Sequence, residues 1–343
     1  MNPVSEGVSR TKPAPRVFVP LHVEERWPVL GARVHMLEGH TMGTGWQLRW
    51  SGPPAPALAP IRRAVEAELD LVVAQMSQWR PDSDLSRFNA AAPGHWQSLP
   101  AAFAEVLTCA LEVAQTSGGA FDPTVGHAVA HWGFGPQSRF DVPGYEPPAR
   151  APGKAATGRW KALRFDAHQP GGVALDLSAI AKGHSVDRMV LCLCMRSLGF
   201  HDVLAEVGGE LRGCGLRPDG QPWWVDVAMP DGQPANNRVA LHGLSIATSG
   251  DAWRCYRDQQ GRFWSHTINP HRAEPISHGL ASVSVLHEEC MRADAWSSAL
   301  TVLGLEQGMA LAQRLGLAAL FVQRRAGGGF EQHLSSALAE LTT

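Results

Sequence analysis

The sequence lacks the features of proteins that bind nucleic acids, cross membranes or are secreted. Its 30 Lys and Arg residues are offset by 32 Asp and Glu residues, so we expect no nucleic-acid or membrane-surface partner. No apolar run reaches the roughly 18 residues that a membrane-spanning helix needs. The N-terminus holds no apolar signal-peptide core. We therefore expect a cytoplasmic protein, or a periplasmic one if a signal has been removed.

Cysteine is present without the spacing of a metal or redox motif. The six cysteines form no Cys-x-x-Cys pair and no zinc-finger pattern with histidine. Cys192 and Cys194 lie in the apolar run MVLCLCM, where buried thiols are expected. A reducing compartment fits this usage best, although an even number of cysteines also permits disulfides.

The composition is that of a folded protein with a sizeable core. Of the 343 residues, 44% are hydrophobic and 18% are charged, whereas a disordered chain is poorer in apolar residues and richer in charge. Residues 1–32 are rich in proline and charge. We expect them to form a flexible N-terminal extension, followed by one domain over residues 33–343.

Hydrophobic periodicity predicts helices and strands in a mixed order. The expected helices cover residues 60–78, 101–116, 178–198 and 291–316. The expected strands are a hairpin over 33–50, the short run GGVALDL at 171–177, a series of short strands over 202–285 and a last strand at 317–322. Because the elements do not alternate as regular βαβ units, the prediction is an α+β fold with mixed sheets and flanking helices.

Two glycine-containing segments could approach a ligand closely. In Met42-Gly43-Thr44-Gly45, free backbone N–H groups could hold a phosphate; the alternative is an ordinary turn. In GGAFDPT, residues 118–124, a helix end leads into an Asp-Pro turn. Asp122 either contributes to a ligand site or caps that turn.

An acidic residue and a lysine flank a predicted helix start at residues 176–183, DLSAIAKG. Helix N-termini attract anions, and a lysine near the first turn strengthens phosphate binding. Asp176 and Lys182 therefore indicate a phosphate site. The alternative is an aspartate near an N-cap with a solvated lysine.

Asp294 and Ser298 stand four residues apart in the last predicted helix, so they share one face. A carboxylate and a hydroxyl with one orientation suit an oxygen-seeking cation such as Mg²⁺. The neighbouring residues are small and apolar, so a buried aspartate there needs a partner. The alternative is a helix-start aspartate with an incidental serine.

Histidine and tryptophan supply further candidates. His266 follows an apolar run and could act as a general base, although a lone histidine is more often structural. Trp79 ends a predicted helix and could stack on a flat ring. His127 and His131 could bind a metal if helical, but without a nearby acidic third ligand a structural role is favoured.

Taken in order, eight short segments resemble the ApbE family, the FAD:protein FMN transferases. They are MGT at 42–44, MSQWRPDSDLSRFN at 76–89, GGAFDPTVG at 118–126, LDLSAIAKGHSVDR at 175–188, EVGGELRGCG at 206–215, IATSGD at 246–251, HTINP at 266–270 and MRADAWSSALTVLG at 291–304. The shared order, rather than any one motif, carries the resemblance, which covers roughly residues 34–323 and implies an ApbE-like flavin transferase fold.

The resemblance implies FAD as a bound substrate, a Mg²⁺ ion and named positions for both. The positions that match FAD-contacting residues are Met42, Trp79, Ala120, Phe121, Asp122, Asp176, Lys182 and Ile268. The positions that match metal ligands are Asp294, Ser298 and, through its backbone carbonyl, Ala179. His266 matches a histidine assigned to proton transfer, and Asp294 is the second residue to which we assign catalysis.

The sequence departs from the family pattern at three places. Trp79 stands where tyrosine is usual, which keeps an aromatic face, and Ser298 stands where threonine is commoner, which keeps the hydroxyl. After HTINP the family continues with Arg-Thr-Gly, whereas this chain has His271-Arg272-Ala273-Glu274. We expect this change to affect the local loop and the docking of a protein substrate.

The implied activity is Mg²⁺-dependent transfer of FMN from FAD to a Thr or Ser hydroxyl of an acceptor protein with an exposed flavinylation motif, releasing AMP. One alternative is a Mg²⁺-dependent FAD pyrophosphatase that gives FMN and AMP, and another is a non-catalytic FAD-binding protein. A redox flavoenzyme with a nicotinamide site is disfavoured because no GxGxxG follows a predicted strand.

Overall fold

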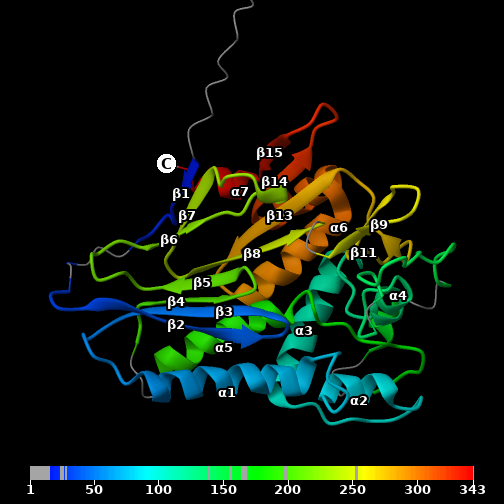
Figure 1. The fold of residues 1–343 in the computed structure, drawn as a ribbon, viewed down its shortest axis with the longest axis horizontal. Coiled ribbons are helices and arrows are strands. Elements are labelled where there is room, and N and C mark those ends of the chain that lie inside the picture. The colour runs from blue at the N-terminus through cyan, green and yellow to red at the C-terminus, as the bar shows by residue number, and fades with distance from the viewer. Residues whose placement is uncertain are drawn as a thin grey trace, which may run out of the picture.

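The fold is built around one large antiparallel sheet. The computed structural model describes residues 16–23, 27, 29–137, 139–153, 157–163, 168–195, 200–251 and 254–342. The eight strands lie in the order β15-β14-β13-β8-β5-β4-β3-β2, and Figure 1 shows them stacked in this order. Their bounds are β2 Arg33–Thr41, β3 Thr44–Gly52, β4 Val203–Val207, β5 Glu210–Cys214, β8 Leu244–Gly250, β13 Leu280–His287, β14 Ala318–Arg324 and β15 Phe330–Leu334.

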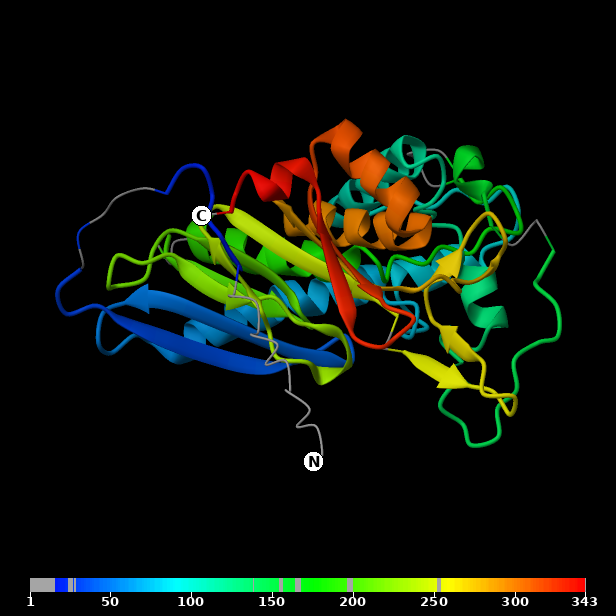
Figure 2. The same cartoon turned by 90° about the horizontal axis from the view of Figure 1, so that it is seen from above.

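Helices cover one face of this sheet. The long ones are α1 Leu58–Met76, α3 Ala101–Thr116, α5 Ala181–Met195 and α6 Cys290–Leu315. Helix α6 packs on β8 and β13, α5 packs on β4 and β5, and α1 packs on α5. Figures 1 and 2 show α6 running along one side of the strands. Shorter helices lie at α2 Asp84–Ala90, α4 Gly126–His131 and α7 Ser336–Ala339, with single 3₁₀ turns at Arg159–Ala162 and Pro230–Gly232.

A small three-stranded sheet covers the opposite face. It has the order β1-β7-β6, with bounds β1 Arg16–Phe18, β7 Asn237–Leu241 and β6 Trp223–Asp226. Its buried side chains Phe18, Val239 and Trp223 share a core cluster with Ile246 and Leu286 of the large sheet. Because side chains alternate along a strand, β13 sends Val283 and Val285 to the helical side and Leu286 to the small sheet.

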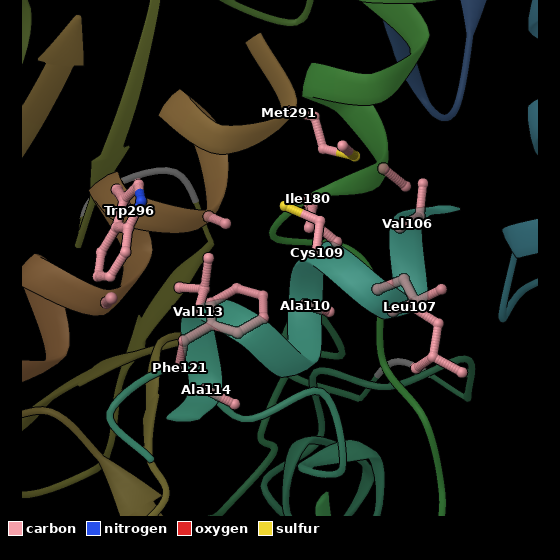
Figure 3. Packing of buried hydrophobic residues seen from close by; sticks show 14 of the residues in the cluster. Val106, Leu107, Cys109, Ala110, Val113, Ala114, Phe121, Ile180, Met291 and Trp296 are labelled. Atoms are coloured by element: carbon pink, nitrogen blue, oxygen red, sulfur yellow. The ribbon is translucent and has the colours of Figure 1, made fainter. Parts of the chain in front are cut away.

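The helical side is held together by a continuous apolar core. Helix α3 contributes Val106, Cys109 and Val113, which lie in one cluster with Met291 and Trp296 of α6. Figure 3 shows this face of α3 turned toward α6 and toward Ile180 and Phe121. The loops that carry candidate site residues therefore begin from packed, rigid elements.

Most of the predicted elements are present, and the α+β class is confirmed. The four expected helices correspond to α1, α3, α5 and α6, except that residues 196–198 lie outside the described residues. The expected hairpin is β2 and β3. All the side chains predicted to form one face of α1 are buried, namely Ile61, Val65, Leu69, Val72 and Met76.

The predicted strand at residues 171–177 is wrong. This segment makes only an isolated bridge, between Val125 and Ala174. Side chains satisfy its backbone instead: the Asn89 amide donates to the Leu175 carbonyl at 2.9 Å and accepts from the Leu175 N–H at 2.7 Å. Segment 123–126 adds backbone bonds on either side, from the Gly126 N–H to the Ala174 carbonyl and from the Asp176 N–H to the Pro123 carbonyl. The hydrophobic run is therefore buried as irregular chain, with Asn89 as the partner of Leu175.

Part of the expected N-terminal extension packs onto the domain. Residues 16–18 form β1, which pairs in parallel with β7, and Phe18 is 1% exposed. Phe18 also bridges to Thr342, so the N-terminal strand lies beside the C-terminal end of the chain (Figure 2). Residues 1–15 lie outside the described residues, and the boundary at residue 32 stays a prediction.

Helices α5 and α6 meet where their backbones touch. The Asp187 carboxylate of α5 accepts from the Cys290 N–H at 3.0 Å and the Met291 N–H at 2.9 Å, which caps the first turn of α6. The Gly183 N–H donates to Asp294 Oδ2 at 3.0 Å. A Cβ at Gly183 would lie no farther than 2.8 Å from backbone atoms of Cys290 and Met291. Only glycine fits this crossing.

We predict that Gly183→Ala lowers the free energy of unfolding by about 2–4 kcal/mol, because the added methyl group meets backbone that Asp187 holds in place. Urea denaturation measures the loss. Gly327→Ala is the matched control, since a Cβ at Gly327 would have no atom within 4 Å. A loss no larger in Gly183→Ala than in the control contradicts the tight crossing.

Candidate functional site

A cleft lies where the loops beside α3, α5 and α6 meet the end of β8. It encloses about 770 Å³, including the part open to solvent. Its lining includes nine of the predicted site residues: Trp79, Ala120, Phe121, Asp122, Asp176, Ala179, His266, Ile268 and Ser298. Segments more than two hundred residues apart in sequence thus form one site.

Three predicted residues do not line the cleft. Met42 lies in the β2–β3 turn at a φ of 50° and packs against the helical core. Lys182 and Asp294 lie on α5 and α6, each within one or two turns of a segment that lines the cleft. They interact with each other electrostatically, so they belong to one polar cluster next to the cleft.

Both oxygens of the Asp122 carboxylate accept hydrogen bonds from the backbone around the cleft. Its Oδ1 accepts from the Thr124 N–H at 2.7 Å, which closes the Asp-Pro turn, and its Oδ2 accepts from the Gly158 N–H. The Asp122 side chain therefore caps the Asp-Pro turn, which is the alternative stated for it from the sequence. Asp122 can serve a ligand by fixing the backbone of Ala120 and Phe121.

Asp176 likewise organises the wall on the other side. Its Oδ1 accepts from the Ser178 N–H at 2.8 Å, and its Oδ2 accepts from the Gln78 side chain at 3.1 Å. Gln78 also donates to Ser178 Oγ at 3.0 Å. These bonds join the start of α5 to the segment that carries Trp79.

Trp79 and Arg254 lie at the exposed edge of the cleft. The Trp79 side chain is 44% exposed, which leaves ring surface for a ligand. The Arg254 guanidinium lies 5.3 Å from the centroid of the Trp79 ring and 5.8 Å from that of Phe140, within cation–π distance. Among the described residues, Arg254 is the one Lys or Arg side chain that lines the cleft.

His266 is held in one orientation by the backbone of Arg254. Its Nδ1 lies 3.1 Å from the Arg254 carbonyl, which also accepts the His266 N–H at 2.9 Å. A carbonyl can only accept, so Nδ1 carries the proton and Nε2 keeps its lone pair. Burial, assisted by the positive charges of Arg254 and Lys182, lowers the pKa of His266 to about 4. The ring is neutral at pH 7 and can accept a proton at Nε2.

Lys182, Glu210 and Asp294 form the polar cluster next to the cleft. Lys182 Nζ makes an ion pair with Glu210 Oε1, and the Lys182 side chain is 32% exposed, so the lysine is partly solvated but has a buried carboxylate as its partner. Burial raises the pKa of Glu210 to about 7 and also raises the pKa of Asp294, in each case against the attraction of Lys182. For Lys182, burial acts to lower the pKa, but the two carboxylates outweigh it and the net shift is upward.

The donor set at the inner wall fits a Mg²⁺ ion that shares its ligands with a substrate. Ala179 and Ser298 line the cleft, Ser298 Oγ lies 2.8 Å from Ser249 Oγ, and Asp294 stands one helical turn before Ser298. In the described part of the chain, no three His, Cys, Asp or Glu side chains form a metal cage. One carboxylate with hydroxyl and carbonyl oxygens suits Mg²⁺, which usually keeps waters and substrate phosphates as ligands.

Several lining residues were not predicted as site residues. Gln78 lies beside Trp79 in the segment 76–89, and Ser249 lies in IATSGD, so the sequence carried a signal for both residues. Arg254 lies outside the family motifs, so no signal in the sequence pointed to it. Glu210, which does not line the cleft, lies in the motif EVGGELRGCG, but its contact with Lys182 arises only in the fold. His131 Nε2 lies 2.9 Å from the Arg150 carbonyl, as a structural role would require, and the structural role of His127 stays a prediction.

The loop that departs from the family pattern closes a short hairpin. Strands β11 Ile268–Asn269 and β12 Glu274–Pro275 pair antiparallel, as do β9 Cys255–Arg257 and β10 Phe263–Ser265 next to them. Ala273, at the place of the family's glycine, adopts a φ of 55°, the left-handed conformation that favours glycine. Its carbonyl accepts from Trp132 Nε1 at 2.8 Å, which holds this turn.

Comparison with known proteins agrees with the resemblance seen in the sequence. The profile of the ApbE family matches residues 42–321. A protein of Vibrio cholerae serotype O1 named FAD:protein FMN transferase is 36% identical over 317 residues, which cover 89% of this chain and 91% of the relative. One from Escherichia coli K12 with the same name is 33% identical, over 88% of this chain and 87% of its own length.

A solved structure has the same fold. The apo form of Pseudomonas stutzeri flavinyl transferase ApbE superposes with a TM-score of 0.81 at 35% identity, covering 90% of this chain and 97% of that one. The fold and the family expected from the sequence are thus confirmed, and this chain belongs to the ApbE family.

Proposed function

We propose that this protein transfers FMN from FAD to a Thr or Ser hydroxyl of an acceptor protein and releases AMP, in a reaction that depends on Mg²⁺. The observation that carries the proposal is that a neutral His266 and Ser298 line one cleft, with Asp294 one helical turn from Ser298 on α6. Membership of a family whose relatives are named FAD:protein FMN transferase supports it.

The flavin ring would lie between the exposed Trp79 face and the wall formed by Ala120, Phe121 and Ile268. Phe121 and Ile268 are buried at 5% and 6% exposure, so this wall is preformed and apolar. Asp122 and Asp176 hold the wall loops through the hydrogen bonds described above. Met42 would contribute from the β2–β3 turn.

The diphosphate of FAD would face the inner wall. Asp294, Ser298 and the Ala179 carbonyl would hold Mg²⁺ there. Such an ion polarises phosphoryl oxygens and stabilises the charge of the AMP leaving group. Lys182 would add positive charge near the same phosphates.

The acceptor hydroxyl would attack the phosphorus next to the flavin. The Nε2 atom of His266 would take the hydroxyl proton, since Nδ1–H is fixed on the Arg254 carbonyl. The O–H bond of the acceptor breaks, a new O–P bond forms, and the P–O bond to AMP breaks. The products are a phosphoester-linked FMN and AMP.

Two other functions of the same site would give different outcomes. In an FAD pyrophosphatase, water takes the place of the hydroxyl, so AMP appears without a modified acceptor. A non-catalytic FAD-binding protein holds FAD and releases no AMP. Following AMP and the mass of the acceptor in one reaction distinguishes all three.

Location stays a prediction from the sequence, which favours the cytoplasm. In the described residues, no helix is both long and apolar enough to cross a membrane.

We predict that Trp79→Ala weakens FAD binding by about 10- to 100-fold, because it removes the stacking surface at the edge of the cleft, and that Trp79→Phe weakens it less. Flavin fluorescence titration measures both. Trp96→Ala is the matched control, since Trp96 is 55% exposed and does not line the cleft. Equal affinities in Trp79→Ala and the control contradict the stacking role.

A further inference from the structure

A buried carboxylate lies next to Lys182 in an unfavourable environment. Glu210 begins β5, directly after Gly208 and Gly209, and its side chain is 3% exposed. Its Oε1 atom pairs with Lys182, but its Oε2 atom is buried without a hydrogen-bond partner. A buried carboxylate with an unsatisfied oxygen opposes folding, and a buried ion pair is often no more stabilising than apolar residues. A contribution to the stability of the fold therefore does not explain why a glutamate stands at position 210.

Lys182 lies between two buried carboxylates but pairs with only one of them. It interacts electrostatically with both Glu210 and Asp294. Within the described residues its ion pair is with Glu210, whereas Asp294 Oδ2 accepts from the Gly183 N–H. The ammonium group is thus held on the β5 side of the cluster and away from the α6 carboxylate.

We propose that Glu210 is a positioning residue that retains the Lys182 ammonium, so that the Asp294 carboxylate stays available to a divalent cation. This inference rests on the metal site of the proposed function. Without the Glu210 charge, the nearest buried carboxylate for Lys182 is Asp294. An ammonium paired there competes with the metal for the same oxygen atoms.

The local fold keeps the arrangement in place. Glu210 pairs across the hairpin with Val207, and the turn between them has two glycines with φ of 63° and 102°. A Cβ at Gly208 would lie 2.9 Å from Thr44 Cγ2 and 3.5 Å from Glu210 Oε2. Glycine at this turn therefore lets the β2–β3 turn and the Glu210 carboxylate come close together.

The test is a titration of Mn²⁺ alone into the full chain, with free Mn²⁺ measured by electron paramagnetic resonance. Mn²⁺ stands in for Mg²⁺ because both accept oxygen ligands. We expect Glu210→Gln to bind Mn²⁺ about 10- to 100-fold more weakly than the wild type, the range seen for residues that orient metal ligands. The double variant Lys182→Met with Glu210→Gln should return to within about threefold of the wild type, since the competing cation is gone.

Glu68→Gln is the matched control. Glu68 is also buried, at 4% side-chain exposure, and pairs with Arg188 at 2.7 Å, but it is not among the carboxylates that act on Lys182. It should leave Mn²⁺ affinity unchanged. A purely structural role for Glu210 predicts that the double variant is at least as impaired as Glu210→Gln alone.

The outcomes separate this inference from the proposed function. Wild-type affinity in Glu210→Gln, or no recovery in the double variant, overturns the positioning role while the metal site stands. A wild-type chain that binds no Mn²⁺, either alone or with FAD present, overturns the metal assignment and this inference with it.

Discussion

Replacing Asp294 by Asn is expected to lower FMN transfer about a thousandfold while leaving the fold intact. Asn keeps the size and the oxygen that accepts the Gly183 N–H, but it removes the one carboxylate of the proposed metal site. Loss of a phosphate-polarising metal is equivalent to several kcal/mol, and about 4 kcal/mol corresponds to a thousandfold in rate. Single-turnover release of AMP at saturating Mg²⁺ measures the effect.

The stability of Asp294→Asn is an internal control on this prediction. Asp294 is 3% exposed, and burial raises the pKa of its carboxyl group, which means that the folded state disfavours the ionised form. At pH 7 the neutral amide removes that penalty. The melting temperature without metal should therefore equal or exceed that of the wild type. Full activity in a folded Asp294→Asn variant contradicts the metal assignment.

The second large effect is expected at His266. His266→Asn should reduce transfer by about 10²- to 10⁴-fold, the usual contribution of a general base. The Asn amide can still donate to the Arg254 carbonyl in place of Nδ1–H, so the loop should keep its shape and FAD should bind with near wild-type affinity. His127→Asn is the matched control, because His127 is exposed on α4 and does not line the cleft.

The pH dependence gives a second test of His266. Its pKa is lowered from 6.5 to about 4, so the base is already deprotonated over the neutral range. At saturating Mg²⁺, which offsets any loss of metal affinity as Glu210 becomes protonated near pH 7, transfer by the wild type should be nearly constant above about pH 5 and should fall below it, as Nε2 of His266 becomes protonated. A wild-type acid limb near pH 6.5, or one that is unchanged in His266→Asn, contradicts the assignment.

The same shift has a consequence for stability. A histidine with a folded-state pKa below its unfolded value stabilises the fold above the unfolded pKa and loses that contribution as the pH falls. For His266 the window runs from 6.5 down to about 4. His184 adds to it, because burial lowers its pKa to about 4 as well and its Nε2 atom is buried without a partner. Each group can contribute a slope of up to about 1.4 kcal/mol per pH unit.

The elements and the family were predictable from the sequence because their signals are local. Helix α1 shows its buried face at helical spacing, and the family motifs are contiguous strings. Asp294 and Ser298 were placed on one helical face by their spacing alone. The cleft then joins His266 to Ser298 and Trp79, as the shared order of the motifs implied.

What the sequence did not reveal depends on contacts between distant segments. Leu175 is not in a strand because Asn89, far away in the chain, occupies its backbone groups. Arg254 matters because its carbonyl holds His266 and its guanidinium covers Trp79. Glu210 is one acidic residue in a β hairpin until the fold brings it to Lys182.

The most direct test of the proposed function is to incubate the protein with FAD and Mg²⁺, with and without a candidate acceptor protein that has an exposed threonine. AMP is measured by chromatography and the acceptor by mass spectrometry, with a Thr→Ala acceptor as control. We predict AMP release together with a gain of one FMN on the threonine acceptor and none on the control. AMP without a modified acceptor contradicts the transferase and indicates hydrolysis, and bound FAD with no AMP contradicts catalysis altogether.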